Sequence, residues 1–143
     1  MSIDMSVVTD LGSLLHTLSP ELKNEVRKLE KVSLKLCKTE CRELFNSVCV
    51  RENLLPNYSN IRLQDEATQR EPIALKFRKQ LVQRELASAK VERTSLEKDC
   101  AERTASLRAT MDETILDPIL AAIETNVNKL EVDTKLSMAH NLQ

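Results

Sequence analysis

A single glycine, Gly12, is the feature that most limits what this chain can fold into. A chain of 143 residues with average composition would carry about ten glycines, and tight turns and phosphate-binding loops depend on them. Aromatic residues are almost as scarce, whereas Ala, Glu, Leu, Lys and Arg make up close to half of the chain. This composition excludes most folds that contain sheets and predicts an all-α protein.

Prolines preceded by capping residues mark the predicted helix boundaries. Ser19 precedes Pro20, and Asp117 precedes Pro118, which is the order typical of an N-cap followed by proline at the first helical position. Pro72 marks a further start in the same way. We therefore expect a short amphipathic helix within residues 1–19, a first main helix over 20–53, an apolar connector over 54–71, a long helix over 72–111, and an acidic C-terminal helix within 112–143 that starts at Pro118.

The long helix carries apolar residues every 3.5 positions, a repeat typical of coiled coils. The predicted seam consists of Val82, Leu86, Ala89, Leu96, Cys100 and Leu107, with Arg93 and Arg103 at the two remaining positions. Forty helical residues span about 60 Å, whereas a compact globule of this length has a diameter of about 37 Å. We expect an elongated helical hairpin or bundle. The seam either mediates association with itself or another helical protein, or packs within the chain against residues 20–53 or 118–140.

The cysteines and histidines are the residues that would bind a metal or act as nucleophiles. Cys37 and Cys41 lie one helical turn apart, but a structural zinc site normally takes four ligands in two closely spaced pairs, and a second pair is missing. We interpret the cysteines as small apolar residues on a buried face, with thiol redox chemistry and zinc binding as lesser alternatives. The single glycine also excludes G-x-G-x-x-G and Walker loops. The sequence therefore predicts no catalytic residue, no metal, no cofactor and no enzymatic activity.

Charge is distributed unevenly, although the formal net charge is only −1. Residues 21–84 contain fourteen basic and nine acidic residues, whereas residues 112–143 contain two basic and six acidic ones. Residues 76–84 hold four bases and no acid: Lys76, Arg78, Lys79 and Arg84. These bases either contact nucleic-acid phosphates or pair with the acidic C-terminal helix of the same or a second chain.

The sequence contains no run of 18 consecutive apolar residues, the length needed to cross a bilayer. Its first ten residues include acidic side chains and no basic one, opposite to the start of a secretory signal. We therefore expect an intracellular protein, without a membrane partner, whose four cysteines stay reduced.

Residues 36–63 and the following Phe77-Arg78-Lys79 contain a recognisable arrangement. A lysine-rich helix carries a phenylalanine and a cysteine four residues apart, then an asparagine, an apolar pair and a proline before a second long helix; here these are Phe45, Cys49, Asn53, Leu54, Leu55 and Pro56. The arrangement covers about a third of the chain and resembles the helical N-terminal region upstream of the reverse transcriptase domain in animal Penelope-like retroelement polyproteins. The chain lacks the paired aspartates of a polymerase. The resemblance therefore implies a helical accessory region or fragment that assists assembly or template handling.

Two functions follow from these patterns. The first is a non-catalytic helical interaction or oligomerisation protein whose partner is itself or another helical protein. The alternative is a nucleic-acid-binding accessory module that uses the basic start of the long helix. The two differ in the surface that binds: the heptad seam in the first case, the four bases in the second.

Overall fold

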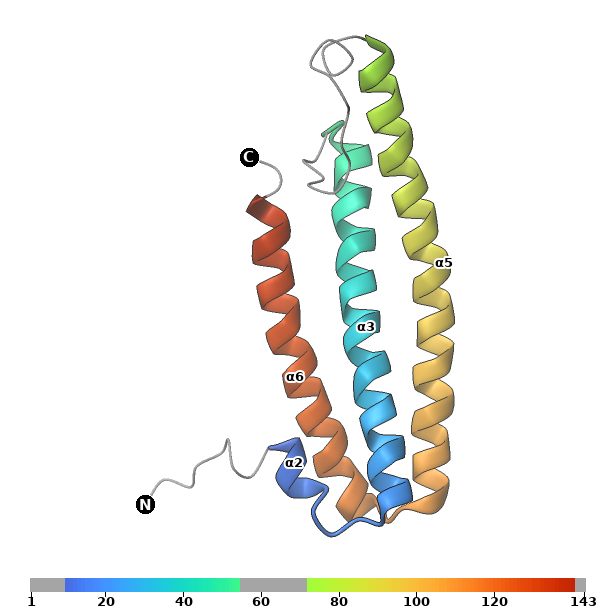
Figure 1. Cartoon of the computed structure of the whole chain (residues 1–143), viewed down its shortest axis with the longest axis vertical. Coiled ribbons are helices and arrows are strands. Elements are labelled where there is room, and N and C mark those ends of the chain that lie inside the picture. The colour runs from blue at the N-terminus through green and yellow to red at the C-terminus, as the bar shows by residue number, and fades with distance from the viewer. Residues whose placement is uncertain (1–9, 55–71, 141–143) are drawn as a thin grey trace, which may run out of the picture.

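The computed structural model describes residues 10–54 and 72–140, and the side chains of the second range from residue 76 onward. Within these ranges the chain is helical and contains no strand, which confirms the predicted all-α class. The helices are α2 (Leu11–Leu14), α3 (Pro20–Arg51), α5 (Pro72–Thr110) and α6 (Glu113–His140). Three long helices lie side by side with α3 in the middle (Figure 1). The start of the predicted N-terminal helix, before residue 10, and connector residues 55–71 lie outside the described residues.

Helix α3 begins where the capping pattern predicts. The Ser19 side chain accepts a hydrogen bond from the backbone N–H of Leu22 at 3.3 Å, and Pro20 occupies the first helical position. The helix ends at Arg51, two residues before the predicted boundary, through a left-handed Asn53 with φ 55°. The N–H of Leu54 donates to the Cys49 carbonyl oxygen at 2.8 Å, which completes a Schellman motif. Asparagine thus terminates the helix at a position where glycine is usual.

Helix α6 does not start at Pro118, so that prediction is wrong. Asp112 is the capping residue, because its carboxylate accepts hydrogen bonds from the backbone N–H and the hydroxyl of Thr114 at 2.9 and 3.0 Å. The helix begins at Glu113 and contains Pro118 in its second turn. Leu116 and Ile119, on either side of the proline, are fully buried. Their burial stabilises a continuous helix by more than the one lost backbone hydrogen bond costs.

The apolar core lies at one end of the molecule, where α3 starts and α5 turns into α6. The short helix α2 covers this end against α6 (Figure 1). The buried residues of this core are Leu11, Leu15, Val26, Leu29, Leu107, Leu116, Ile119, Ala122 and Ile123. We call this region the closed end.

Farther from the closed end, α3 and α5 remain paired through smaller and more polar residues. Thr39 and Asn46 of α3 are buried there, as is Ala89 of α5. Arg42 crosses the interface and bonds to Glu92 at 2.8 Å. Both side chains are about one third exposed, so water screens the pair and its contribution to stability is small.

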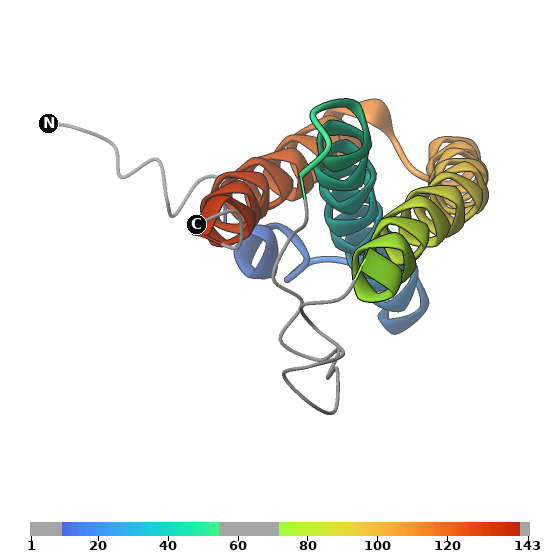
Figure 2. The same cartoon turned by 90° about the horizontal axis from the view of Figure 1, so that it is seen from above.

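Helix α6 packs on α3 rather than on α5. The view along the bundle shows α5 and α6 on different sides of α3 (Figure 2). The two helices meet at the closed end, where Arg108 of α5 lies 3.7 Å from Asp117 of α6. Toward its C-terminus, α6 leans away from α3 (Figure 1). The three helices therefore form a closed bundle at one end and leave part of α3 uncovered at the other.

Candidate interaction surface

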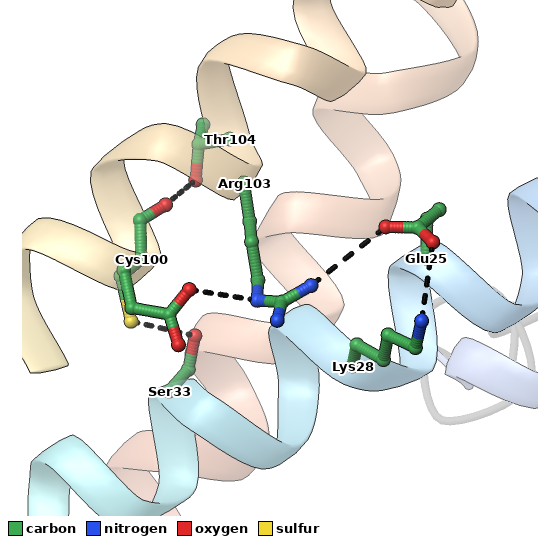
Figure 3. Close-up of polar contacts among 7 residues, drawn as sticks. Glu25, Lys28, Ser33, Cys100, Arg103 and Thr104 are labelled. Carbon is green, nitrogen blue, oxygen red and sulfur yellow. Dashed lines mark hydrogen bonds and ion pairs between the residues drawn. The ribbon is translucent and has the colours of Figure 1, made fainter.

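The predicted heptad seam is covered by α3 of the same chain. Val82, Ala89 and Leu107 are buried, and the other seam residues, Leu86, Leu96 and Cys100, are half-buried. The Sγ atom of Cys100 lies 3.8 Å from the hydroxyl of Ser33 on α3 (Figure 3). A partner would have to separate α3 from α5 to reach these residues, so the seam is not an open surface in this structure.

The two arginines that interrupt the seam reach across to acidic residues of α3. Arg103 bonds to Asp99 at 2.9 Å on its own helix and lies 3.7 Å from Glu25 of α3 (Figure 3). Arg93 bonds to Glu43 of α3 in the same way. The arginines therefore lie at the edge of the intramolecular seam, with their charged ends outside it.

The four predicted nucleic-acid-contacting residues gather at the start of α5. Lys76, Lys79 and Arg84 are exposed, and Arg78 is half-buried. None of the four forms an ion pair with a carboxylate of residues 10–54 or 76–140. The predicted intramolecular pairing with the acidic α6 is therefore not made by the described residues, and α3 separates the two helices (Figures 1 and 2). We call residues 76–84 the basic arm.

A groove between α3 and α6, which the sequence analysis did not identify, lies beyond the closed end. Its volume is about 290 Å³, and its lining residues are Cys37, Glu40, Cys41, Leu44, Val127, Glu131 and Lys135. The two thiols form a covered floor, with exposed fractions of 4% each. Leu44, one turn further along α3, is 51% exposed. We call this surface the α3–α6 groove.

The floor of the groove is uncharged at neutral pH. Burial, assisted by the neighbouring Cys41, raises the pKa of the Cys37 thiol to about 11. Burial raises the pKa of Cys41 as well. The Cys37 thiol also lies 3.6 Å from the Val127 carbonyl oxygen, to which it donates. Neutral thiols bind metals poorly and are weak nucleophiles, so the pair acts here as a small apolar surface.

The rim of the groove carries an excess of negative charge. Partial desolvation, followed by the nearby Glu97 carboxylate, raises the pKa of Glu40, while Arg93 opposes the shift. Glu131 on the α6 side accepts a hydrogen bond from Lys135 at 2.7 Å. Carboxylates of α3 and α6 thus flank the apolar floor, and Glu97 of α5 lies near Glu40.

The sequence contained part of the signal for this groove. Cys37, Cys41, Leu44 and Val48 continue the apolar row of α3 at steps of three and four residues. That row predicts an apolar face of α3 that packs against another helix, but it does not predict how far along α3 this packing extends. Only the direction of α6 decides that Leu44 is left exposed.

Comparison with protein-family models, with curated proteins and with solved structures found no match for this chain. Among the described side chains, no three histidine, cysteine, aspartate or glutamate residues gather as a metal site requires. None of the helices in the described ranges is both long enough and apolar enough to span a membrane. Within the described residues, the α3–α6 groove and the basic arm are the candidate interaction surfaces.

Proposed function

We propose that this protein is a non-catalytic helical interaction protein and that its α3–α6 groove binds an amphipathic helix. The observation that carries the proposal is the abrupt change along α3 from the buried Cys37 and Cys41 to the half-exposed Leu44. The apolar row of α3 continues at helical spacing, but α6 no longer covers it at Leu44. An amphipathic helix presents apolar residues at matching intervals and is the element that most often fills such grooves.

The chemistry of the rim specifies which helix fits. The carboxylates of Glu40 and Glu131 flank the apolar floor. A helix with one apolar face and lysine or arginine beside it would bury its apolar residues on the thiols and place its charges against the rim. A helix with acidic flanks would meet like charge there, which costs binding energy.

The test uses a fluorescent peptide of about twenty residues, with leucine at helical spacing and lysine elsewhere, titrated by fluorescence anisotropy. We expect the protein to bind this peptide and not its glutamate counterpart. Leu44→Asp should weaken binding about tenfold, since burial of the exposed half of a leucine contributes about 1 kcal/mol and the new carboxylate would lose water beneath the apolar face of the peptide.

The matched control is Val91→Asp, which places the same charge at a residue of α5 that is 73% exposed and remote from the groove lining. Binding should be unchanged in this variant. Far-ultraviolet circular dichroism should show native helicity for both variants. Equal binding of the lysine and glutamate peptides, or no effect of Leu44→Asp, would contradict the proposal.

A second candidate function is nucleic-acid binding by the basic arm. It is favoured because no carboxylate in the described part of the chain pairs with the four bases. This function also agrees with an accessory region upstream of a reverse transcriptase, as the sequence resemblance implies. Affinity for an RNA or DNA oligonucleotide should fall steeply with salt and be lost when all four bases are changed to glutamine.

The control for this experiment changes four exposed lysines outside the arm to glutamine: Lys31, Lys38, Lys90 and Lys98. The net charge then changes equally in both variants. Equal loss of affinity in the two would show unspecific electrostatic attraction, and no binding at about 50 mM salt would exclude the function.

A further inference from the structure

We propose that the helix bound by the α3–α6 groove is the basic arm of a second copy of this chain, so that two copies exchange arms as a two-fold dimer. This inference rests on the proposed function of the groove and names its partner. Three features of the described residues support it: charge, the apolar outer face of the arm, and the spacing between arm and groove.

The charges of the two surfaces are complementary. The arm has four bases and no acid between Lys76 and Arg84. Near the groove, Glu40 lies close to three further carboxylates, those of Glu43, Glu97 and Glu131, and Arg93 and Lys135 partly offset them. Among the described residues, no carboxylate forms an ion pair with the basic arm, and two bases stand against four carboxylates near the groove.

The exposed side of the arm is also amphipathic. Phe77 is 41% exposed and lies seven residues before Arg84. Residues spaced by seven fall on one side of a helix, and here this side faces away from the buried Val82. The arm therefore offers one large aromatic side chain with bases beside it. Aromatic rings pack favourably against sulfur, and the groove floor presents two thiols.

The positions of arm and groove along the bundle are compatible with both contacts in one dimer. Cys49 and Val82 line the same small pocket, so these residues are level along the bundle. At 1.5 Å per residue, the middle of the arm lies about 3 Å beyond this level, and Cys41 in the groove about 12 Å before it. A two-fold axis across the bundle, midway between them, places each arm at the level of the other copy's groove. Such an interface is closed and stops at two copies.

Charge exchange between variants tests the proposal. The arm variant carries Lys76→Glu, Lys79→Glu and Arg84→Glu, and the groove variant carries Glu40→Lys and Glu131→Lys. We expect the wild type to sediment as a dimer that salt weakens, and each variant alone to dimerise at least about a hundredfold more weakly. An equimolar mixture of the two should recover dimers with one copy of each, because every arm then meets a groove of opposite charge.

The matched control changes three exposed lysines outside the arm: Lys31→Glu, Lys90→Glu and Lys98→Glu. It should remain a dimer and should pair with the groove variant no better than the wild type does. Helicity by circular dichroism establishes that each variant is folded. Glu40→Lys alone is a milder groove variant that should weaken the dimer in the same direction.

The outcomes separate this proposal from the function of the groove. A wild type that is monomeric at about 100 µM, or folded variants that show no recovery on mixing, would overturn self-association. If that monomer still binds the lysine peptide through Leu44, the groove retains its function and only the partner is wrong. If the monomer instead binds an oligonucleotide through the arm, the arm serves nucleic acid and the dimer proposal fails.

Discussion

Truncation of Leu116 to alanine should reveal where the free energy of unfolding comes from. Leu116 is fully buried at the closed end of the molecule. Removal of a buried leucine side chain to alanine costs 2 to 5 kcal/mol in general, and we expect about 3 kcal/mol here. For a chain of this length, that loss lowers the melting temperature by about 10 °C.

The same substitution at Leu136, on the same helix, is the matched control. Leu136 is 61% exposed, so Leu136→Ala removes little buried surface, and we expect a change below about 0.5 kcal/mol. Helix propensity changes equally at both sites, so the difference between the variants reports burial alone. Urea denaturation followed by circular dichroism measures both values. Equal costs at the two positions would refute the placement of the core at the closed end.

Three further predictions concern single residues. Pro118→Ala should raise the free energy of unfolding by about 1 kcal/mol in urea denaturation, because α6 regains a backbone donor and loses a steric clash. Asp112→Ala should lower the melting temperature at neutral pH. The hydrogen bonds from Thr114 lower the pKa of Asp112 in the folded state, so its contribution is present above the unfolded pKa and is lost as pH falls from about 5 to about 2. Cys37, with its pKa raised to about 11, should react with iodoacetamide at about pH 8 at least tenfold more slowly in the folded protein than in urea.

Each of these predictions has an outcome that contradicts it. A less stable Pro118→Ala variant would mean that the proline ring itself packs in the closed end. If the effect of Asp112→Ala is the same at low and neutral pH, the charge of the cap contributes nothing. Equal alkylation of Cys37 in the folded and unfolded states would place the thiol on an exposed surface instead of the groove floor.

The course of α3 could be predicted closely because its signals are local. The Ser19 side chain accepts a hydrogen bond from a backbone N–H in the first turn, and Pro20 has no N–H that needs a partner. Both effects are independent of the rest of the chain. The same local rules failed for α6, where the Asp117-Pro118 pair has the pattern of a helix start. The burial of Leu116 depends on α3 and α5 being in place, and a local pattern carries no information about such distant contacts.

Of the two candidate surfaces, one could be predicted from the sequence and the other could not. The four bases of the basic arm could be identified from their order in the chain, because a run without acids is a property of adjacent residues. The α3–α6 groove could not be identified, since it depends on the direction in which α6 leaves the closed end. The heptad repeat of α5 indicated a covered seam but not which helix covers it.

Local signals were sufficient to predict long helices, because scarce glycine and capped prolines act through the backbone of a few neighbouring residues. Tertiary packing alone places α3 on the seam of α5 and leaves Leu44 exposed beside Cys41. Packing was needed because burial is a property of pairs of surfaces. An apolar row specifies one surface of a pair, and its partner is set by how the whole chain packs.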